Sequence, residues 1–154
     1  KYRPAILNGV QYNHPLGFAL YNLNNSKEHI RQMGVAIVFE GEKSALKYAS
    51  MFGADNDISV ATCGSNLIQH QVDLLRQYGA REIVIAFDKQ FKEVNDNEFK
   101  QWTKKLTALH NKYSKLVNIS FMFDKKGDML GYKDAPIDCG AETFIKLFKE
   151  RVRL

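Results

Sequence analysis

The segment Val35-Ala36-Ile37-Val38-Phe39-Glu40-Gly41-Glu42-Lys43-Ser44 joins five consecutive apolar residues to a short polar turn. Such an apolar run, with two valines in it, predicts a strand buried on both faces. Beyond the turn, apolar residues recur at helical spacing up to Gly53, a helix stop signal. A strand, a glycine-containing turn and a helix place polar side chains at the carboxyl edge of a parallel sheet, where open α/β folds bind ligands. Glu40 lies at that edge, where a carboxylate indicates metal or proton chemistry.

Three more segments have the composition of buried strands, and helical patterns lie between them. Parallel strands need crossover connections, and crossover helices cover the faces of the sheet. The alternation therefore predicts an α/β fold with a parallel four-stranded sheet flanked by helices. The strands are expected at residues 35–39, 58–62, 82–87 and 116–123.

The helices of this pattern are defined by their apolar faces and caps. Between Asp96 and Tyr113, large apolar residues recur at helical spacing and form one stripe. Ser65 or Asn66 is expected to cap the helix before that one. The predicted face of the last helix consists of Ala141, Ile145, Phe148 and Val152.

Residues 1–34 differ from the rest and are expected to be a short lead-in segment, with residues 35–154 as the main domain. Turn signals at 8–9, 13–15 and 22–25 separate short apolar stretches. They predict short strands or an extended arm that leads into a brief helix. Ser26 is the expected cap of this helix and Gly34 its end.

The composition fits one soluble domain of 154 residues, with 45% hydrophobic and 25% charged residues. A net charge of +5 favours phosphate-bearing partners, although many soluble domains are as basic. The two distant cysteines, Cys63 and Cys139, cannot form a structural zinc site and suggest a reduced, cytoplasmic protein. No apolar run approaches ~18 residues, so no membrane partner is expected. The start at Lys1 suggests a piece of a longer protein.

Three of the four predicted strands end in an acid, namely Glu40, Asp88 and Asp124. In a parallel sheet these ends share one edge, so the three carboxylates can converge. Clustered carboxylates repel one another unless a cation or a proton compensates, and Mg²⁺ prefers oxygen ligands. The plainer interpretation is that each acid is a solvated residue at the start of a loop.

The loop between Asp124 and Asp138 is rich in acids and lysines. Its spacing does not fit an EF-hand. The segment 133–138 holds two carboxylates around a proline just before a helix, so it could bring an acid and a lysine back over the sheet edge. The sequence contains neither a P-loop nor a dinucleotide-binding glycine motif. Cys63 has no identifiable base and is a weak candidate for a nucleophile.

With these residues in place, the chain resembles the Toprim domain. This is the catalytic module of bacterial-type DNA primases, type IA and II topoisomerases, OLD-family nucleases and recombination proteins of the RecR type. The strand running into Glu40-Gly41 and the strand running into Asp88 are similar to the two motifs of the family. The segments at 39–46, 62–66 and 133–138 look most like those of primases encoded by phages or mobile elements. The resemblance implies a Toprim/Rossmann-like fold over residues 35–154.

The resemblance also implies a set of site residues. Glu40 corresponds to a glutamate that serves as metal ligand or general acid/base, Asp88 to the first acid of a DxD metal motif, and Asp134 to a further acid near the metals. Two departures reduce the negative charge, because Gln90 stands at the second position of the DxD motif and Ser44 at another acid position. The residues that could compensate are Glu42, Glu93 and Asp124, of which Asp124 is also an expected metal ligand.

The implied activity is nucleotidyl transfer dependent on Mg²⁺ or Mn²⁺, which makes an RNA primer on a single-stranded DNA template during replication. Its partners would be nucleoside triphosphates, the template and a replicative helicase. Lys43, Lys89 and Lys133 lie at the same edge and could pair with phosphate oxygens.

Three other interpretations remain open. A Toprim nuclease would use the same acids to cleave a phosphodiester bond. A DNA-binding module with a weakened site would explain Gln90 and Ser44. An unrelated flavodoxin-like domain would bind a small ligand and ignore DNA.

Overall fold

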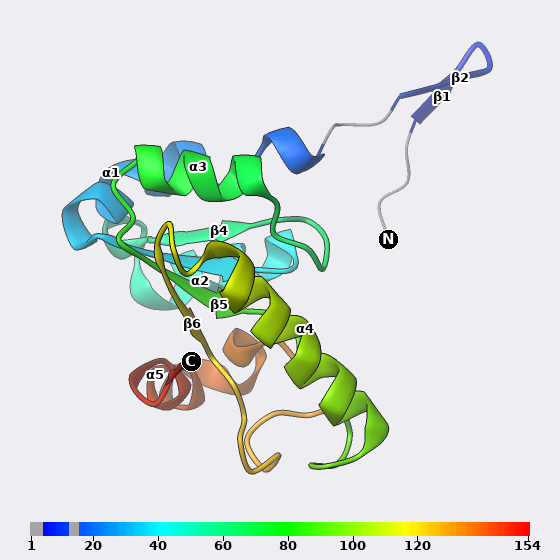
Figure 1. Ribbon diagram of the computed structural model, residues 1–154. Helices are drawn as coiled ribbons and strands as arrows, with labels where there is room; N and C mark the ends of the chain where they lie inside the picture. The colour runs from blue at the N-terminus through cyan, green and yellow to red at the C-terminus, as the bar shows by residue number, and fades with distance from the viewer. Residues whose placement is uncertain (1–4, 13–15) are drawn as a thin grey trace.

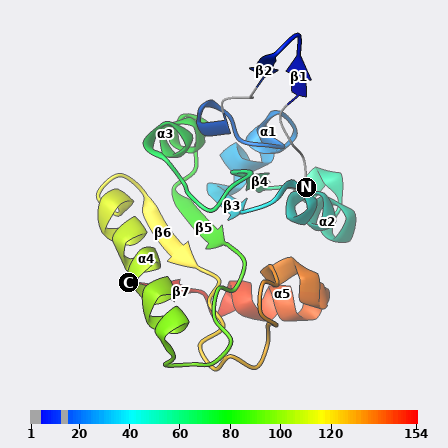
Figure 2. The same ribbon diagram turned by 90° about the vertical axis from the view of Figure 1, so that its right-hand side faces the viewer.

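The computed structural model describes residues 5–12 and 16–154, which form a five-stranded sheet covered by helices (Figure 1). The strand order is β4-β3-β5-β6-β7, and helices α3 and α4 lie on the opposite side of the sheet from α2 and α5 (Figure 2). The strands are β3 (Val35–Phe39), β4 (Ser59–Ala61), β5 (Glu82–Ala86), β6 (Asn118–Phe121) and β7 (Val152–Arg153). The helices are α1 (Leu23–Met33), α2 (Glu42–Phe52), α3 (Gln69–Gln77), α4 (Asn97–Tyr113) and α5 (Gly140–Lys149).

The predicted α/β fold is confirmed, and its four expected strands pair in parallel. The structure adds β7, which runs antiparallel to β6 and contains Val152, a residue expected on the last helix. The helix ends earlier because the Arg151 side chain donates to the carbonyl oxygen of Phe148 at 2.8 Å. The same guanidinium donates to Glu82 at 2.8 and 3.0 Å and so holds the chain against the sheet.

The α4 stripe is confirmed, since Trp102, Leu106 and Tyr113 are buried. The predicted face of the last helix is confirmed only in part, because Phe148 packs against the core whereas Ile145 is exposed. In α5 the buried residues are Phe144 and Leu147, whereas Ile145 is exposed. The reason is a preceding 3₁₀ turn, η3 (Pro136–Cys139), which sets the rotation of the helix. This rotation packs Phe144 against the aromatic rings of α2 and β3.

Both predicted helix caps are wrong. Helix α1 begins at Leu23, so Ser26 lies inside its first turn, and the Ser26 hydroxyl donates to the carbonyl oxygen of Asn22. Helix α3 begins only at Gln69, where the side chain of Gln71 accepts a bond from the backbone N–H of Ile68 at 3.1 Å. The expected helix end at Gly34 is confirmed, with a φ of 70° that suits glycine.

The N-terminal part contains a hairpin and a segment that packs on the sheet. The hairpin consists of β1 (Ala5–Leu7) and β2 (Val10–Tyr12), joined at the expected Asn8-Gly9 turn, and it projects from the body (Figure 1). After the 3₁₀ turn η1 (Leu16–Phe18), the backbone of Tyr21 pairs with that of Ala61 at the edge of β4. The turn expected at 13–15 lies outside the described residues, and the domain boundary at residue 34 stays a prediction.

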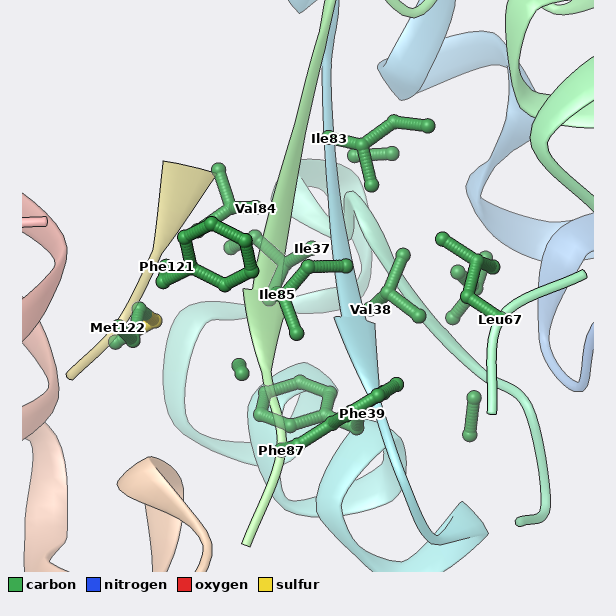
Figure 3. Close-up of a cluster of buried hydrophobic side chains, with 14 of the residues drawn as sticks. Ile37, Val38, Phe39, Leu67, Ile83, Val84, Ile85, Phe87, Phe121 and Met122 are labelled. Atoms are coloured by element: carbon green, nitrogen blue, oxygen red, sulfur yellow. The ribbon is translucent and has the colours of Figure 1, made fainter. Parts of the chain in front are cut away.

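The central strands β3 and β5 supply most of the core. Ile37, Val38 and Phe39 of β3 are buried, as are Ile83, Val84 and Ile85 of β5 (Figure 3). Phe39 and Phe87 lie at the carboxyl ends of the two strands, next to the polar residues that follow. In the part of the chain that the structure describes, no helix combines the length and the apolar character needed to span a bilayer.

Candidate active site at the carboxyl edge of the sheet

Glu40 and Asp88 follow neighbouring parallel strands and lie at the same edge of the sheet. Phe39 pairs with Ala86, so Glu40 comes directly after β3 and Asp88 two residues after the end of β5. Burial and then the nearby carboxylate of Glu40 raise the pKa of Asp88 to about 6. One oxygen of Glu40, Oε2, is buried without a hydrogen-bond partner among residues 5–12 and 16–154. The strand ends therefore hold two interacting carboxylates whose charge is incompletely compensated.

The loop between β6 and α5 brings two more acids to this edge, as expected for the segment 133–138. The carboxylates of Asp134 and Asp138 both contribute to the raised pKa of Asp88. Asp134 Oδ2 accepts a bond from the backbone N–H of Gly131 at 2.9 Å, and Asp138 forms an ion pair with Lys47 of α2. Asp138 is thus the more neutralised of the two, and Asp134 is the better candidate for a ligand.

Asp124 and Lys89 have a different role from the one expected. Their side chains form a buried ion pair at 3.2 Å, with 1% and 3% of the respective side chains exposed. The Lys89 ammonium also donates to the carbonyl oxygens of Gly127 (2.9 Å) and Leu130 (2.7 Å). Asp124 accepts bonds from three backbone N–H groups of its own loop. Since all these groups are engaged, neither residue is placed to bind a metal or a phosphate.

The buried pair instead holds the loop in position. The backbone N–H of Lys89 donates to the carbonyl oxygen of Asp134 at 2.9 Å, and the N–H of Lys133 donates to the carbonyl oxygen of Lys89 at 2.9 Å. Lys89 therefore binds the loop through its backbone and through its side chain. As a consequence, Lys133 and Asp134 lie beside the end of β5.

The remaining lysines differ in their distance from the acids. Lys133 donates to the side-chain oxygen of Gln90, and its charge counteracts the rise in the pKa of Asp88. Lys43 is exposed in the first turn of α2. Lys105 of α4, which the sequence analysis did not single out, interacts electrostatically with both Glu40 and Lys133. Its position three residues after Trp102, at the border of the buried stripe, is the signal that could have identified it.

The oxygen ligands at this edge suit a hard divalent cation. A cation would compensate the oxygen of Glu40 that has no partner among the described residues, and also the burial and neighbouring carboxylates that together raise the pKa of Asp88. Among residues 5–12 and 16–154, however, no three acid, histidine or cysteine side chains are grouped closely enough to hold a metal ion. Binding would therefore require the carboxylates to draw together.

Cys63 does not have the surroundings of a nucleophile. It lies on the loop after β4 with a backbone φ of 55°. Burial and then the carboxylate of Glu42 raise the pKa of its thiol. The thiolate is therefore disfavoured, as expected of a cysteine without a base.

The comparisons with known proteins relate this fold to primases. No model of a known protein family matches the sequence. The SPbeta prophage-derived uncharacterized protein YorJ of Bacillus subtilis is 31% identical in an alignment of 161 positions, which covers all of this chain and 42% of the relative. The zinc-binding and RNA polymerase domains of the Aquifex aeolicus primase match 92% of this chain with 23% identity and a TM-score of 0.63. The DnaG primase catalytic domain bound to single-stranded DNA matches 93%, with 18% identity and a TM-score of 0.61.

These matches show the fold. The chain has the mixed α/β fold found in the catalytic domains of DnaG-type primases. It spans 42% of the length of the curated relative and between 32% and 44% of the lengths of the matched primase chains.

Proposed function

We propose that this chain is the Toprim-type catalytic domain of a phage-type DNA primase, which makes RNA primers on a DNA template by metal-dependent nucleotidyl transfer. The observation that carries the proposal is the approach of Glu40 and Asp88 at one sheet edge, where burial and then the carboxylate of Glu40 raise the pKa of Asp88 to about 6. The similarity in fold to primase domains supports it, as does the relation to a prophage protein.

In this proposal Glu40, Asp88 and Asp134 hold Mg²⁺ or Mn²⁺ at the edge of the sheet. The bound ion supplies charge stabilisation at the phosphates and activates the attacking hydroxyl group. Lys133 pairs with phosphate oxygens beside the ion, and its bond to Gln90 keeps the ammonium at this position. Base identity is read by pairing with the template, so this chain needs no residues that recognise a particular base.

The remaining parts of the proposal concern partners. Nucleoside triphosphates and single-stranded DNA are the substrates, and a replicative helicase is the expected partner of the whole protein. The formal net charge of +5 supports binding to a phosphate backbone. Such binding should weaken as the salt concentration rises.

The first test is metal binding measured by thermal unfolding. Mn²⁺ is titrated into the wild-type chain, into Glu40→Gln, and into a control, Glu28→Gln, which alters an exposed carboxylate of α1. We expect Mn²⁺ to raise the melting temperature of the wild type and of the control and to leave Glu40→Gln unchanged. Equal stabilisation of all three proteins, or of none, would contradict the proposal.

The second test separates the possible activities of a metal-binding site. The Mn²⁺-loaded chain is incubated with nucleoside triphosphates and a single-stranded template, and in parallel with supercoiled circular DNA. Incorporation of labelled nucleotides that disappears in Asp88→Asn supports primer synthesis. Nicking of the circle without incorporation would indicate a Toprim nuclease instead.

A further inference from the structure

A polar groove of about 600 Å³ opens beside the acid cluster, between α4 and the turn at residues 131–133. Trp102 and Lys105 line it from α4, and Tyr132 and Lys133 line it from the turn. Glu40 also lines it, so the groove leads to the acid at the end of β3. Its other lining residues are Ser65, Gln90, Glu98 and Gln101.

Two lysines, Lys105 and Lys133, line the groove. Among the described residues, neither Lys105 nor Lys133 forms an ion pair with a carboxylate. The ammonium of Lys105 lies 5.1 Å from the centre of the Trp102 ring. Burial lowers the pKa of Lys105, and the charge of Lys133 lowers it further, while Glu40 opposes this. Both ammonium groups would therefore gain from an anion placed between them.

A third lysine, Lys92, lies against the ring of Tyr132, one of the lining residues. Tyr132 is 44% exposed, and the ammonium groups of Lys92 and Lys133 lie 5.3 and 5.1 Å from the centre of its ring. The charged residues that line the groove are thus Lys105 and Glu98 of α4, Lys133 of the turn, and Glu40 at the end of β3. Two ammonium groups beside the proposed metal-binding carboxylate suit a ligand that carries several phosphates and ends at that carboxylate.

We propose that this groove binds the triphosphate of a nucleoside triphosphate, with Lys105 as a phosphate-binding residue opposite Lys133. The proposal rests on the proposed function, because it places the substrate of that reaction beside Glu40. Lys105 would bind phosphate oxygens in place of Lys89, which was expected to do so from its position in the sequence. The ammonium of Lys89 instead donates to Asp124 and to the carbonyl oxygen of Leu130. A groove of about 600 Å³ with one lysine on α4 and one on the turn fits a chain of phosphates better than a single phosphate.

The only tryptophan of the chain, Trp102, reports on the groove. Inorganic triphosphate, which does not absorb in the excitation range, is titrated without divalent metal while the Trp102 emission is followed. The variant is Lys105→Met, which keeps the aliphatic stem on the ring and removes the charge. The control, Lys104→Met, removes the same charge from an exposed position of α4 outside the groove.

We expect saturable binding to the wild type, a dissociation constant at least about tenfold higher for Lys105→Met, and a change below about twofold for Lys104→Met. Lys105→Arg should recover most of the affinity, which a loss of folding could not explain. Equal weakening by Lys105→Met and Lys104→Met would overturn the proposal, as would an emission that does not change with triphosphate. Binding of a thymidine oligonucleotide that depends on Lys105, without binding of triphosphate, would assign the groove to a DNA strand and also overturn it.

The two proposals fail in different ways. If Mn²⁺ does not stabilise the wild-type chain but triphosphate binds through Lys105, the proposal of a metal-dependent reaction is wrong, whereas the proposed role of the groove stands. If Mn²⁺ binds through Glu40 and triphosphate leaves Trp102 unaffected, only the groove is wrong.

Discussion

Replacing Asp88 by asparagine should make the metal-free protein more stable at neutral pH. In the folded protein, burial and the carboxylate of Glu40 raise the pKa of Asp88 from 3.8 to about 6. When folding raises the pKa of a group, the protonated group stabilises the fold. This stability is complete below the pKa of the group in the unfolded protein, and it is lost as the pH rises through the pKa in the folded protein. At pH 7.5 the ionised Asp88 therefore destabilises the fold, and an uncharged amide removes that cost.

The magnitude follows from the same pKa. A tenfold change in proton binding corresponds to about 1.4 kcal/mol, so the rise from 3.8 to about 6 corresponds to at most about 3 kcal/mol. Asp88 is only partly buried, and water screens the repulsion, so we expect about 1–2 kcal/mol. In urea this should raise the unfolding midpoint by ~0.5–1 M.

The assay is urea unfolding in the presence of a chelator at several pH values. The urea midpoint of Asp88→Asn should exceed that of the wild type at pH 7.5. The difference between the two midpoints should vanish below about pH 4, where both side chains are neutral. The exposed Asp55 of η2 (Ala54–Asn56) supplies the control, since Asp55→Asn should change neither the midpoint nor its pH dependence. An Asp88→Asn protein that is less stable at pH 7.5, or equally more stable at pH 3.5, would refute the reasoning.

Excess Mn²⁺ should reverse this order of stability if the proposed site binds it. A ligand at 100 times its dissociation constant stabilises the protein that binds it by about 2.7 kcal/mol. That gain would go to the wild type and not to Asp88→Asn. Asp88 would then destabilise the metal-free protein and stabilise the Mn²⁺-bound protein.

Three further predictions concern buried polar groups. Lys89→Met should lower the free energy of unfolding by about 3 kcal/mol or more in urea titrations, because it leaves the carboxylate of Asp124 buried without its cation. Combining Lys89→Met with Asp124→Leu should recover part of this loss, because the unpaired carboxylate is then removed as well. Glu82→Gln should lower the free energy of unfolding by about 2 kcal/mol at pH 7, because the hydrogen bond from Arg151 lowers the pKa of Glu82 to about 2. This stability is lost as the pH falls from 4.5 to about 2, so thermal unfolding should show almost no difference near pH 2. Tyr113→Phe should lower the unfolding free energy by about 1 kcal/mol in urea, because the fully buried hydroxyl donates to a backbone carbonyl at 3.1 Å.

The approach of Glu40 and Asp88 was predictable because it depends on topology. Once two parallel strands neighbour each other, the residues after them share an edge, and the apolar runs before both acids identify the strands. That the loop at 133–138 could return to this edge was expected on a different ground, its two carboxylates around a proline just before a helix. Neither argument predicted the order of strands or the short β7, which depends on the contact of Arg151 with Glu82.

The roles of Lys89 and Asp124 could not be predicted from their positions in the sequence. Each follows a strand directly or nearly so, as a ligand would, and only the folded loop shows that they face inward toward each other. A buried ion pair is rarely expected from sequence because it depends on partners that are distant in the chain, here 35 residues apart. Lys105 is the converse case, since a lysine next to a buried stripe looks like an ordinary solvent-exposed helix residue.

The four parallel strands of the sheet, β4-β3-β5-β6, have a neighbour along both outer strands. The backbone of Tyr21 covers β4 on one side, and β7 covers β6 on the other. Open strand borders invite neighbouring molecules to add their own strands and so promote aggregation. The hairpin of β1 and β2 is one place where unpaired strand borders and exposed apolar side chains coincide, as at Ile6 and Val10. Charged substitutions there should therefore be an effective means of keeping concentrated solutions of this protein monomeric.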